Sequence, residues 1–119
     1  RLQLGEVILE STAARIPCHV LARRMEDPQF VKRFRAAERP GMYCRVIQPG
    51  TLQTGAAVSH TPHAGPTLTV VEMLRAYYDQ HLSEATLLRY LAAPIAVRAR
   101  ADNEEKLAKI RAAGRAAGV

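Results

Sequence analysis

The sequence predicts an α+β protein in which a strand-rich first half precedes a helical second half. Short apolar runs, broken by proline and glycine, fill residues 2–61, a pattern typical of strands and turns. From residue 67 onward the apolar residues recur at helical spacing instead. Residues 61–66 are rich in proline, glycine and small polar residues, which indicates a linker. We therefore predict one unit over residues 1–62 and a second unit over residues 67–119.

Three stretches of the first half are expected to be strands. Apolar residues dominate residues 2–9, with Gly5 as a bulge or bend. Residues 42–47 form the second expected strand, and residues 56–60 form the third. Three short strands cannot close a barrel or cover both sides of a core. Either they pack under the helices, or further strands precede this sequence.

Two short helices are expected between the first and second strands. The apolar spacing within residues 18–25 is compatible with a short helical turn. Asp27 then provides a helix cap, and Pro28 suits the first position of a helix that extends to Ala37.

The second half is expected to form three helices. Thr69 and Glu72 have the spacing of a capping box, which marks the start of the first helix. Ser83 is the expected cap of the second helix, and Pro94 opens the third.

Composition narrows the classes of function. The 119 residues include 17 Lys and Arg against 11 Asp and Glu, and this basic balance favours anionic partners. The six aromatic residues, four Tyr and two Phe, form no RNA-binding pattern, so no stable nucleic-acid partner is expected. Neither a membrane-length apolar run nor an export signal is found in the sequence, which favours the cytoplasm and no membrane partner. Two cysteines make no disulfide framework there, so both thiols are expected to be free.

The residue with the clearest chemical potential is Cys18. It follows the first strand-prone stretch, is preceded by the rigid Pro17, and has Arg15, His19 and Arg23 nearby. Cations near a thiol favour the thiolate, which is the form that attacks electrophiles or binds soft metals. The alternative is a small buried hydrophobic residue, which is the commoner role of a lone cysteine.

Several short motifs, taken in order, give the chain a resemblance to the YiiM-like MOSC proteins. They are residues 5–10, 15–18, 30–34 and 41–46, followed by Pro49, Gly50 and Gly55. Residues 69–78 look like the start of the three-helix domain that follows the MOSC domain in that family. The resemblance implies the C-terminal half of a pyruvate-kinase-type β-barrel with an inserted helix, followed by a three-helix domain. It also implies further barrel strands before Gly5 in family members.

The same resemblance implies a function. Members of the family bind a molybdopterin-type cofactor, and their metal-ligating, catalytic cysteine corresponds to Cys18. YiiM-like members are linked to the reduction of N-hydroxylated bases, which requires a redox partner to supply electrons. Sulfur ligands suit molybdenum, and basic side chains suit the phosphate of the pterin. We expect Arg15 and Arg45 to hold that phosphate, with Lys32 as a weaker candidate, and Tyr43 either lines the pocket or packs.

Other interpretations of the same residues stay open. Arg45 suits solvent as well as a polar cavity, and a solvated helix face is the usual role of a lysine such as Lys32. Cys44 is expected to be a buried strand residue. At the level of function, one rival is a sulfur or cofactor carrier that uses Cys18 without turnover. Another is a structural fragment whose helices mediate homodimerisation.

Overall fold

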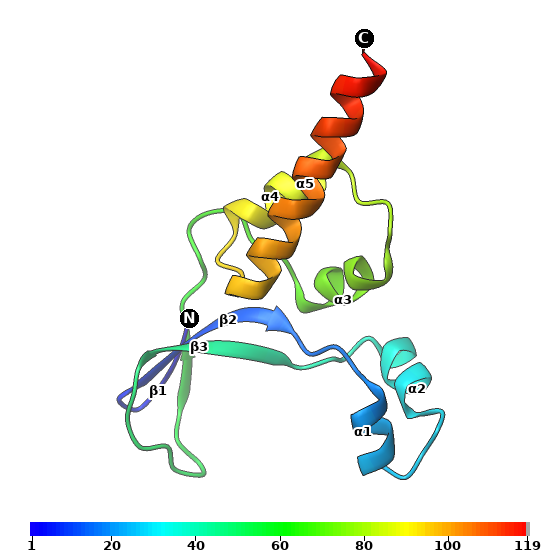
Figure 1. The fold of residues 1–119 in the computed structure, drawn as a ribbon. Coiled ribbons are helices and arrows are strands. Elements are labelled where there is room, and N and C mark those ends of the chain that lie inside the picture. Colours follow the sequence, from blue (N-terminus) through cyan, green and yellow to red (C-terminus); the bar gives the residue numbers. More distant parts are fainter. Residues whose placement is uncertain (119) are drawn as a thin grey trace.

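A computed structural model of the chain describes residues 1–118, and it confirms the α+β class. Its elements are β1 (Leu2–Leu4), β2 (Val7–Ala14), α1 (His19–Arg24), α2 (Phe30–Ala37), β3 (Met42–Gln48), β4 (Val58–His60), α3 (Val70–Tyr78), α4 (Glu84–Ala92) and α5 (Val97–Ala117). The helices α3, α4 and α5 lie together on one side of the sheet, while α1 and α2 extend from its end (Figure 1). None of the described helices is long and apolar enough to span a membrane.

The four strands form one antiparallel sheet in the order β3-β2-β1-β4. The single stretch expected over residues 2–9 is in fact two strands, because the chain reverses at Gly5 and pairs Leu4 with Val7. Gly5 has a φ of +61°, a conformation that costs glycine little, so the expected bend is a tight turn.

The second strand, β2, continues to Ala14, well beyond the stretch expected from the sequence. Its pairing with β3 shifts register between Ser11 and Ala13, which leaves Thr12 as a bulge. The Thr12 carbonyl oxygen accepts a hydrogen bond of 3.1 Å from the backbone N–H of Ala96, immediately before α5. The bulge therefore joins the sheet to the helical half.

The helical half has its own apolar core. Leu74 of α3 and Leu87 of α4 are 1% and 0% exposed. Tyr90, Ala93 and Ile95 form a buried cluster, against which Met73 and other residues pack.

Two of the three helix starts expected in this half are confirmed. The capping box at Thr69 is confirmed, since its hydroxyl accepts from the Glu72 N–H at 3.0 Å and the Glu72 carboxylate accepts from the Thr69 N–H at 2.7 Å. Ser83 caps α4 through the Thr86 N–H at 3.2 Å, as expected. The third helix begins later than expected, at Val97 instead of Pro94, because the preceding turn is bonded to the sheet.

Two further boundaries differ from the sequence prediction. Helix α2 begins at Phe30 and not at Pro28, although the Asp27 carboxylate does accept from the backbone N–H of Gln29 at 2.9 Å. The third expected strand is shorter than predicted, because pairing of β4 with β1 begins at Val58.

Two sets of side-chain contacts fix the helical half on the sheet half. The Arg45 guanidinium of β3 donates to the carbonyl oxygen of Ile95 at 3.1 Å. Near the end of α2, Arg75 of α3 makes a bidentate contact with Glu38, with both N–O distances at 2.7 Å. Arg35 of α2 also stacks on the ring of Tyr78, 3.9 Å from its centre. These contacts hold α2, and α1 packed beside it, against α3.

Candidate functional site around Cys18

Cys18 occupies the N-cap position of α1, at the end of a short segment that follows β2. The backbone N–H of Arg15 donates to the Gly41 carbonyl at 3.3 Å, which ties this segment to the start of β3. Pro17 is buried, whereas Cys18 is exposed. The thiol is therefore presented to solvent from an anchored backbone. Among the described residues, Cys18 is therefore not buried as the alternative interpretation expected.

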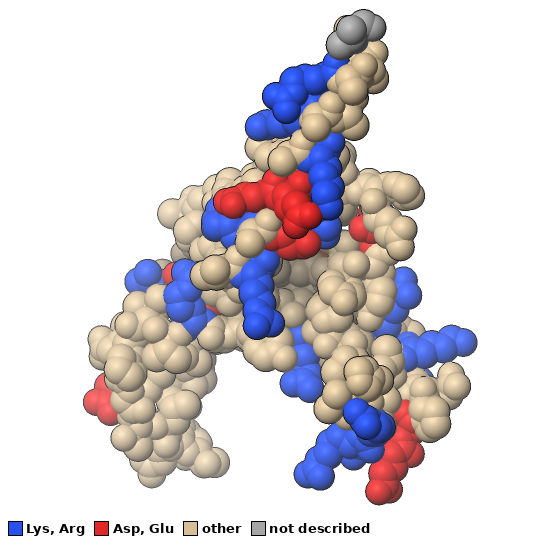
Figure 2. All heavy atoms as spheres, in the orientation of Figure 1, with Lys and Arg blue, Asp and Glu red and all other residues tan. Residues whose placement is uncertain are grey.

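The surroundings of the Cys18 thiol favour its ionised form. The backbone N–H groups of Leu21 and Val20, in the first turn of α1, are the main cause of a lowered Cys18 pKa, and the charges of Arg15 and Arg23 add to it. The sulfur makes no capping hydrogen bond of regular geometry. The two N–H groups nevertheless lie near enough to stabilise a thiolate. Figure 2 shows basic side chains, with acidic ones among them, over the end of the molecule that α1 and α2 form.

The structure places Arg45 away from Cys18. Arg45 is opposite Glu10 in the β2–β3 ladder, four residues before the Ala14 end of β2. At about 3.3 Å per strand residue, this is roughly 13 Å back along the strand. Its guanidinium contacts the Glu10 carboxylate at 3.2 Å as well as the Ile95 carbonyl. Arg45 therefore links the sheet to the helical half.

Tyr43 and Lys32, two other candidates, are both exposed but lie on different elements. Tyr43 pairs with Ala13, near the end of β2 that leads to Cys18, and its side chain is available to a ligand there. Lys32 is on α2, beside a hollow that it shares with Arg35 and other α2 and α3 residues. The structure thus brings Arg15 and the Tyr43 end of β3 towards Cys18, and it leaves Lys32 on a neighbouring helix.

The comparison of sequences identifies the first half of the chain. Residues 1–59 match the family described as "MOSC domain". Residues 1–59 therefore belong to the MOSC domain family. This family is associated with molybdenum-cofactor binding. No curated protein matches the chain.

Solved structures show the same fold over nearly the whole chain. YiiM from Escherichia coli is 17% identical, with a TM-score of 0.79 over 91% of this chain and 54% of that protein. YiiM from Geobacillus stearothermophilus is 20% identical, with a TM-score of 0.79 over 89% of this chain and 55% of that protein. This MOSC chain therefore has the YiiM fold, including the helical part, and spans about half the length of these proteins. The expected partial barrel followed by helices is confirmed.

The Cys18 thiol of this MOSC chain is a suitable sulfur ligand for a molybdenum cofactor. An exposed thiol with a lowered pKa is a soft ligand of the kind that oxidised molybdenum accepts. Cys44, in contrast, is half-buried in β3 opposite Ser11. Within residues 1–118, no group of three or more His, Cys, Asp or Glu side chains is arranged to hold a metal ion by itself. The fit therefore requires a metal whose other ligands come mainly from the cofactor itself.

The two backbone N–H groups that act most on Cys18 were not predicted from the sequence. Leu21 and Val20 are apolar residues, so nothing in their side chains suggests a role in a polar site. The available signal was the helical turn expected over residues 18–25, because a residue at a helix N-terminus faces unpaired N–H groups.

Proposed function

We propose that this MOSC protein binds the molybdenum cofactor through the Cys18 thiolate and reduces N-hydroxylated compounds, N-hydroxylated bases among them. The observation that carries the proposal is the exposed Cys18 sulfur at the start of α1, stabilised as a thiolate by nearby N–H groups and two arginines. Membership of the MOSC family supports the choice of metal.

The reaction defines what each participant must supply. Reduction of N–OH to N–H consumes two electrons and two protons and releases water. When bound, the cofactor supplies two-electron redox chemistry, and a separate redox partner must deliver the electrons. Cys18 holds the metal by its sulfur. Among the basic candidates we assign the anionic end of the cofactor to Arg15, which is exposed and three residues away, since Arg45 already contacts Glu10 and Ile95.

Enclosure of the cofactor is expected to need more of the barrel than these strands provide. The chain spans about half of each matched YiiM structure. Within the described residues, β3 and β4 are the two edges of the sheet, and each pairs with a single strand. We propose that further strands complete the barrel at these edges. We also propose the cytoplasm as the site of action, because its reducing conditions keep Cys18 and Cys44 free.

Metal content tests the proposal directly. The protein should be produced in a host that synthesises molybdenum cofactor, purified, and analysed for molybdenum by mass spectrometry. We expect Cys18→Ser to lose most of the bound molybdenum and Cys44→Ser to retain it. Absence of molybdenum from the unsubstituted protein, or equal content in both variants, would contradict the proposal.

One rival function uses the same thiolate. An exposed cysteine with a lowered pKa would also suit a carrier that holds sulfur as a persulfide. The two functions differ in turnover, so the molybdenum-loaded protein should be incubated with an N-hydroxylated base and reduced methyl viologen. Repeated conversion to the unhydroxylated base supports the reductase. Persulfide on Cys18 after a separate incubation with polysulfide, which transfers sulfane sulfur to a thiolate, together with no conversion of the base, supports the carrier.

A further inference from the structure

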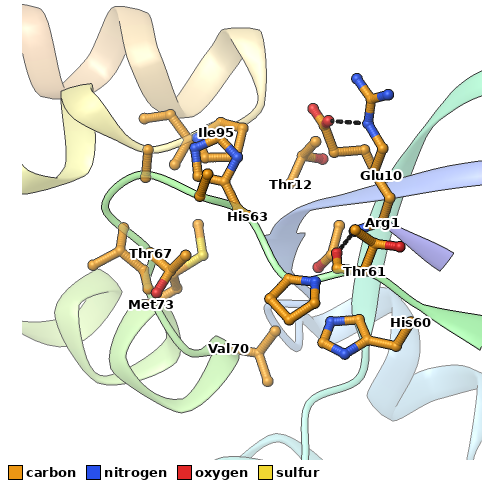
Figure 3. A pocket seen from close by; sticks show the side chains of 16 residues that line it. Arg1, Glu10, Thr12, His60, Thr61, His63, Thr67, Val70, Met73 and Ile95 are labelled. Atoms are coloured by element: carbon orange, nitrogen blue, oxygen red, sulfur yellow. Dashed lines mark hydrogen bonds and ion pairs between the residues drawn. The ribbon is translucent and has the colours of Figure 1, made fainter.

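A cleft separates the sheet from the helical half on the side where residues 61–67 connect them. It has a volume of about 620 Å³, which is in the size range of small-molecule sites. Figure 3 shows Arg1, Glu10 and Thr12 of the sheet facing Met73, Val70 and Ile95 of the helical half. His63 extends into the space between these two walls from the connecting segment (Figure 3).

This cleft is distinct from the site around Cys18. Its lining residues on β2 are Glu10, Ser11 and Thr12, and no lining residue belongs to α1 or to the segment 15–18 that presents the thiol. Thr12, the lining residue of β2 nearest to Cys18 in the sequence, precedes it by six residues. A ligand in the cleft therefore meets different residues from a ligand on Cys18.

The sheet wall of the cleft offers hydrogen-bond acceptors in a fixed position. Glu10 is held by Arg1 at 3.1 Å and by Arg45 at 3.2 Å, one to each carboxylate oxygen. A carboxylate has about four lone-pair directions, so two contacts leave acceptor capacity for a ligand N–H or O–H. The Glu10 side chain is 13% exposed and is among the residues that line the cleft.

The opposite wall is apolar. Met73 and Val70 come from α3, and Ile95 comes from the turn before α5. A methionine thioether makes favourable contacts with aromatic rings, and its flexible side chain adapts to their shape. The cleft thus pairs an apolar wall with an anchored acceptor.

The two charged side chains that line the cleft, Arg1 and Glu10, are bound to each other at 3.1 Å. An ionic ligand would lose hydration there without meeting an unpaired opposite charge, which is unfavourable. A neutral ligand meets no such cost.

We propose that this cleft is a second small-molecule site, for a neutral aromatic compound that packs on Met73 and donates a hydrogen bond to Glu10. Binding is independent of Cys18 and of the molybdenum cofactor. Because the ligand contacts both halves, it also stabilises their docking.

Three probes of nearly equal shape test the charge preference: benzamide is neutral, benzoate is an anion and benzamidine is a cation. The sequence has three methionines, of which Met73 lines the cleft while Met25 and Met42 are exposed elsewhere. The purified protein, labelled with ¹³C on the methionine methyl groups, should be titrated with each probe by NMR. We expect benzamide to shift the Met73 signal with half-saturation on the order of millimolar, as befits a small fragment. Benzoate and benzamidine should bind about tenfold more weakly or less.

Two variants complete the test. His63→Ala removes a side chain that lines the cleft, and it should weaken benzamide binding by about threefold or more. His81→Ala, at an exposed position before α4, and Cys18→Ser should bind benzamide as the unsubstituted protein does. The proposal is overturned if no methionine signal shifts, if all three shift alike, or if a charged probe binds as well as benzamide. Benzamide binding requires neither Cys18 nor the metal. A failure of the molybdenum experiment would therefore leave this proposal standing, and a failure of the benzamide titration would leave the proposed function standing.

Discussion

The two halves of the molecule differ in how completely they bury their apolar residues. In the helical half, Leu74 and Leu87 are 1% and 0% exposed. In the sheet half, Val46 of β3, Leu52 of the following loop and Val58 of β4 are 58%, 55% and 57% exposed. The helices supply one another with a core, whereas the sheet has apolar surface and two edges still available for packing.

This difference separates the most deeply buried core residues from Cys18, the proposed metal ligand. Cys18 lies in the half with the less complete core, at the end of a strand that is held to the helices by Thr12 and by Arg45 of the neighbouring strand. The helical half therefore serves as a support for the sheet. Substitutions in the two halves should differ accordingly in their effect on stability.

The largest difference is expected between core leucines and exposed sheet residues. Leu87→Ala should lower the free energy of unfolding by about 2–5 kcal/mol, because it leaves a cavity among fully buried neighbours. Val46→Ala, at a site that is mostly exposed, should change it by less than about 0.5 kcal/mol. Urea unfolding followed by circular dichroism measures both. Equal costs would show that the sheet half is packed as tightly as the helical half.

The contact between the halves should have an intermediate effect. Arg45→Met keeps the length of the side chain but removes the hydrogen bonds to Glu10 and Ile95. We expect a loss of about 1–2 kcal/mol, at the low end for a charged hydrogen bond because the arginine side chain is 45% exposed. Arg39→Met, at an exposed position between α2 and β3, is the matched control and should be nearly neutral. A neutral Arg45→Met would show that this residue is not a structural link.

The capping box of α3 should contribute about as much as a typical helix cap. Thr69→Ala removes the hydroxyl that accepts from the Glu72 N–H, and it should cost about 1 kcal/mol of unfolding free energy. Thr54→Ala, in an exposed turn, makes the same chemical change without a cap. Thermal unfolding of the two variants side by side measures the difference, and a Thr69→Ala protein as stable as the Thr54→Ala protein would contradict the assigned role.

The smallest expected effect concerns the Cys18 pKa. Because this pKa is lowered in the folded protein, the thiolate fraction and the rate of alkylation by iodoacetamide should rise with pH through a midpoint below that of an ordinary cysteine. Arg15→Gln should raise the Cys18 pKa only slightly, since the N–H groups of Leu21 and Val20 act more strongly than the charge of Arg15.

A salt titration and a control sharpen this prediction. The contribution of Arg15 should be largely lost in 1 M salt, whose screening length is about 3 Å. Arg24→Gln, which changes a neighbouring charge that does not act on the thiol, should leave the Cys18 pKa unchanged. Equal changes of the Cys18 pKa in the Arg15→Gln and Arg24→Gln variants would indicate a general effect of net charge instead of a local effect of Arg15.

Local signals in the sequence were sufficient for much of the fold. The caps at Thr69 and Ser83 and the short helix after Cys18 were predicted, because each depends on residues within one helical turn. The extension of β2 to Ala14 was missed, since small residues such as Ala13 adopt a strand there through pairing with distant β3. Contacts between remote residues leave no local pattern.

The candidate site shows the same limit. The basic surroundings of Cys18 were predicted from adjacent residues, whereas its exposed position was left open. The structural role of Arg45 was not, because the Ile95 carbonyl that it binds is 50 residues away in the sequence.

The central claim is that the Cys18 sulfur is a ligand of molybdenum. X-ray absorption at the molybdenum edge, on the loaded protein and on its Cys18→Ser variant, tests it most directly. The molybdenum that Cys18→Ser still retains should have one fewer sulfur ligand, replaced by an oxygen or nitrogen, with the remaining ligands unchanged. An identical sulfur shell around molybdenum in both proteins would contradict it.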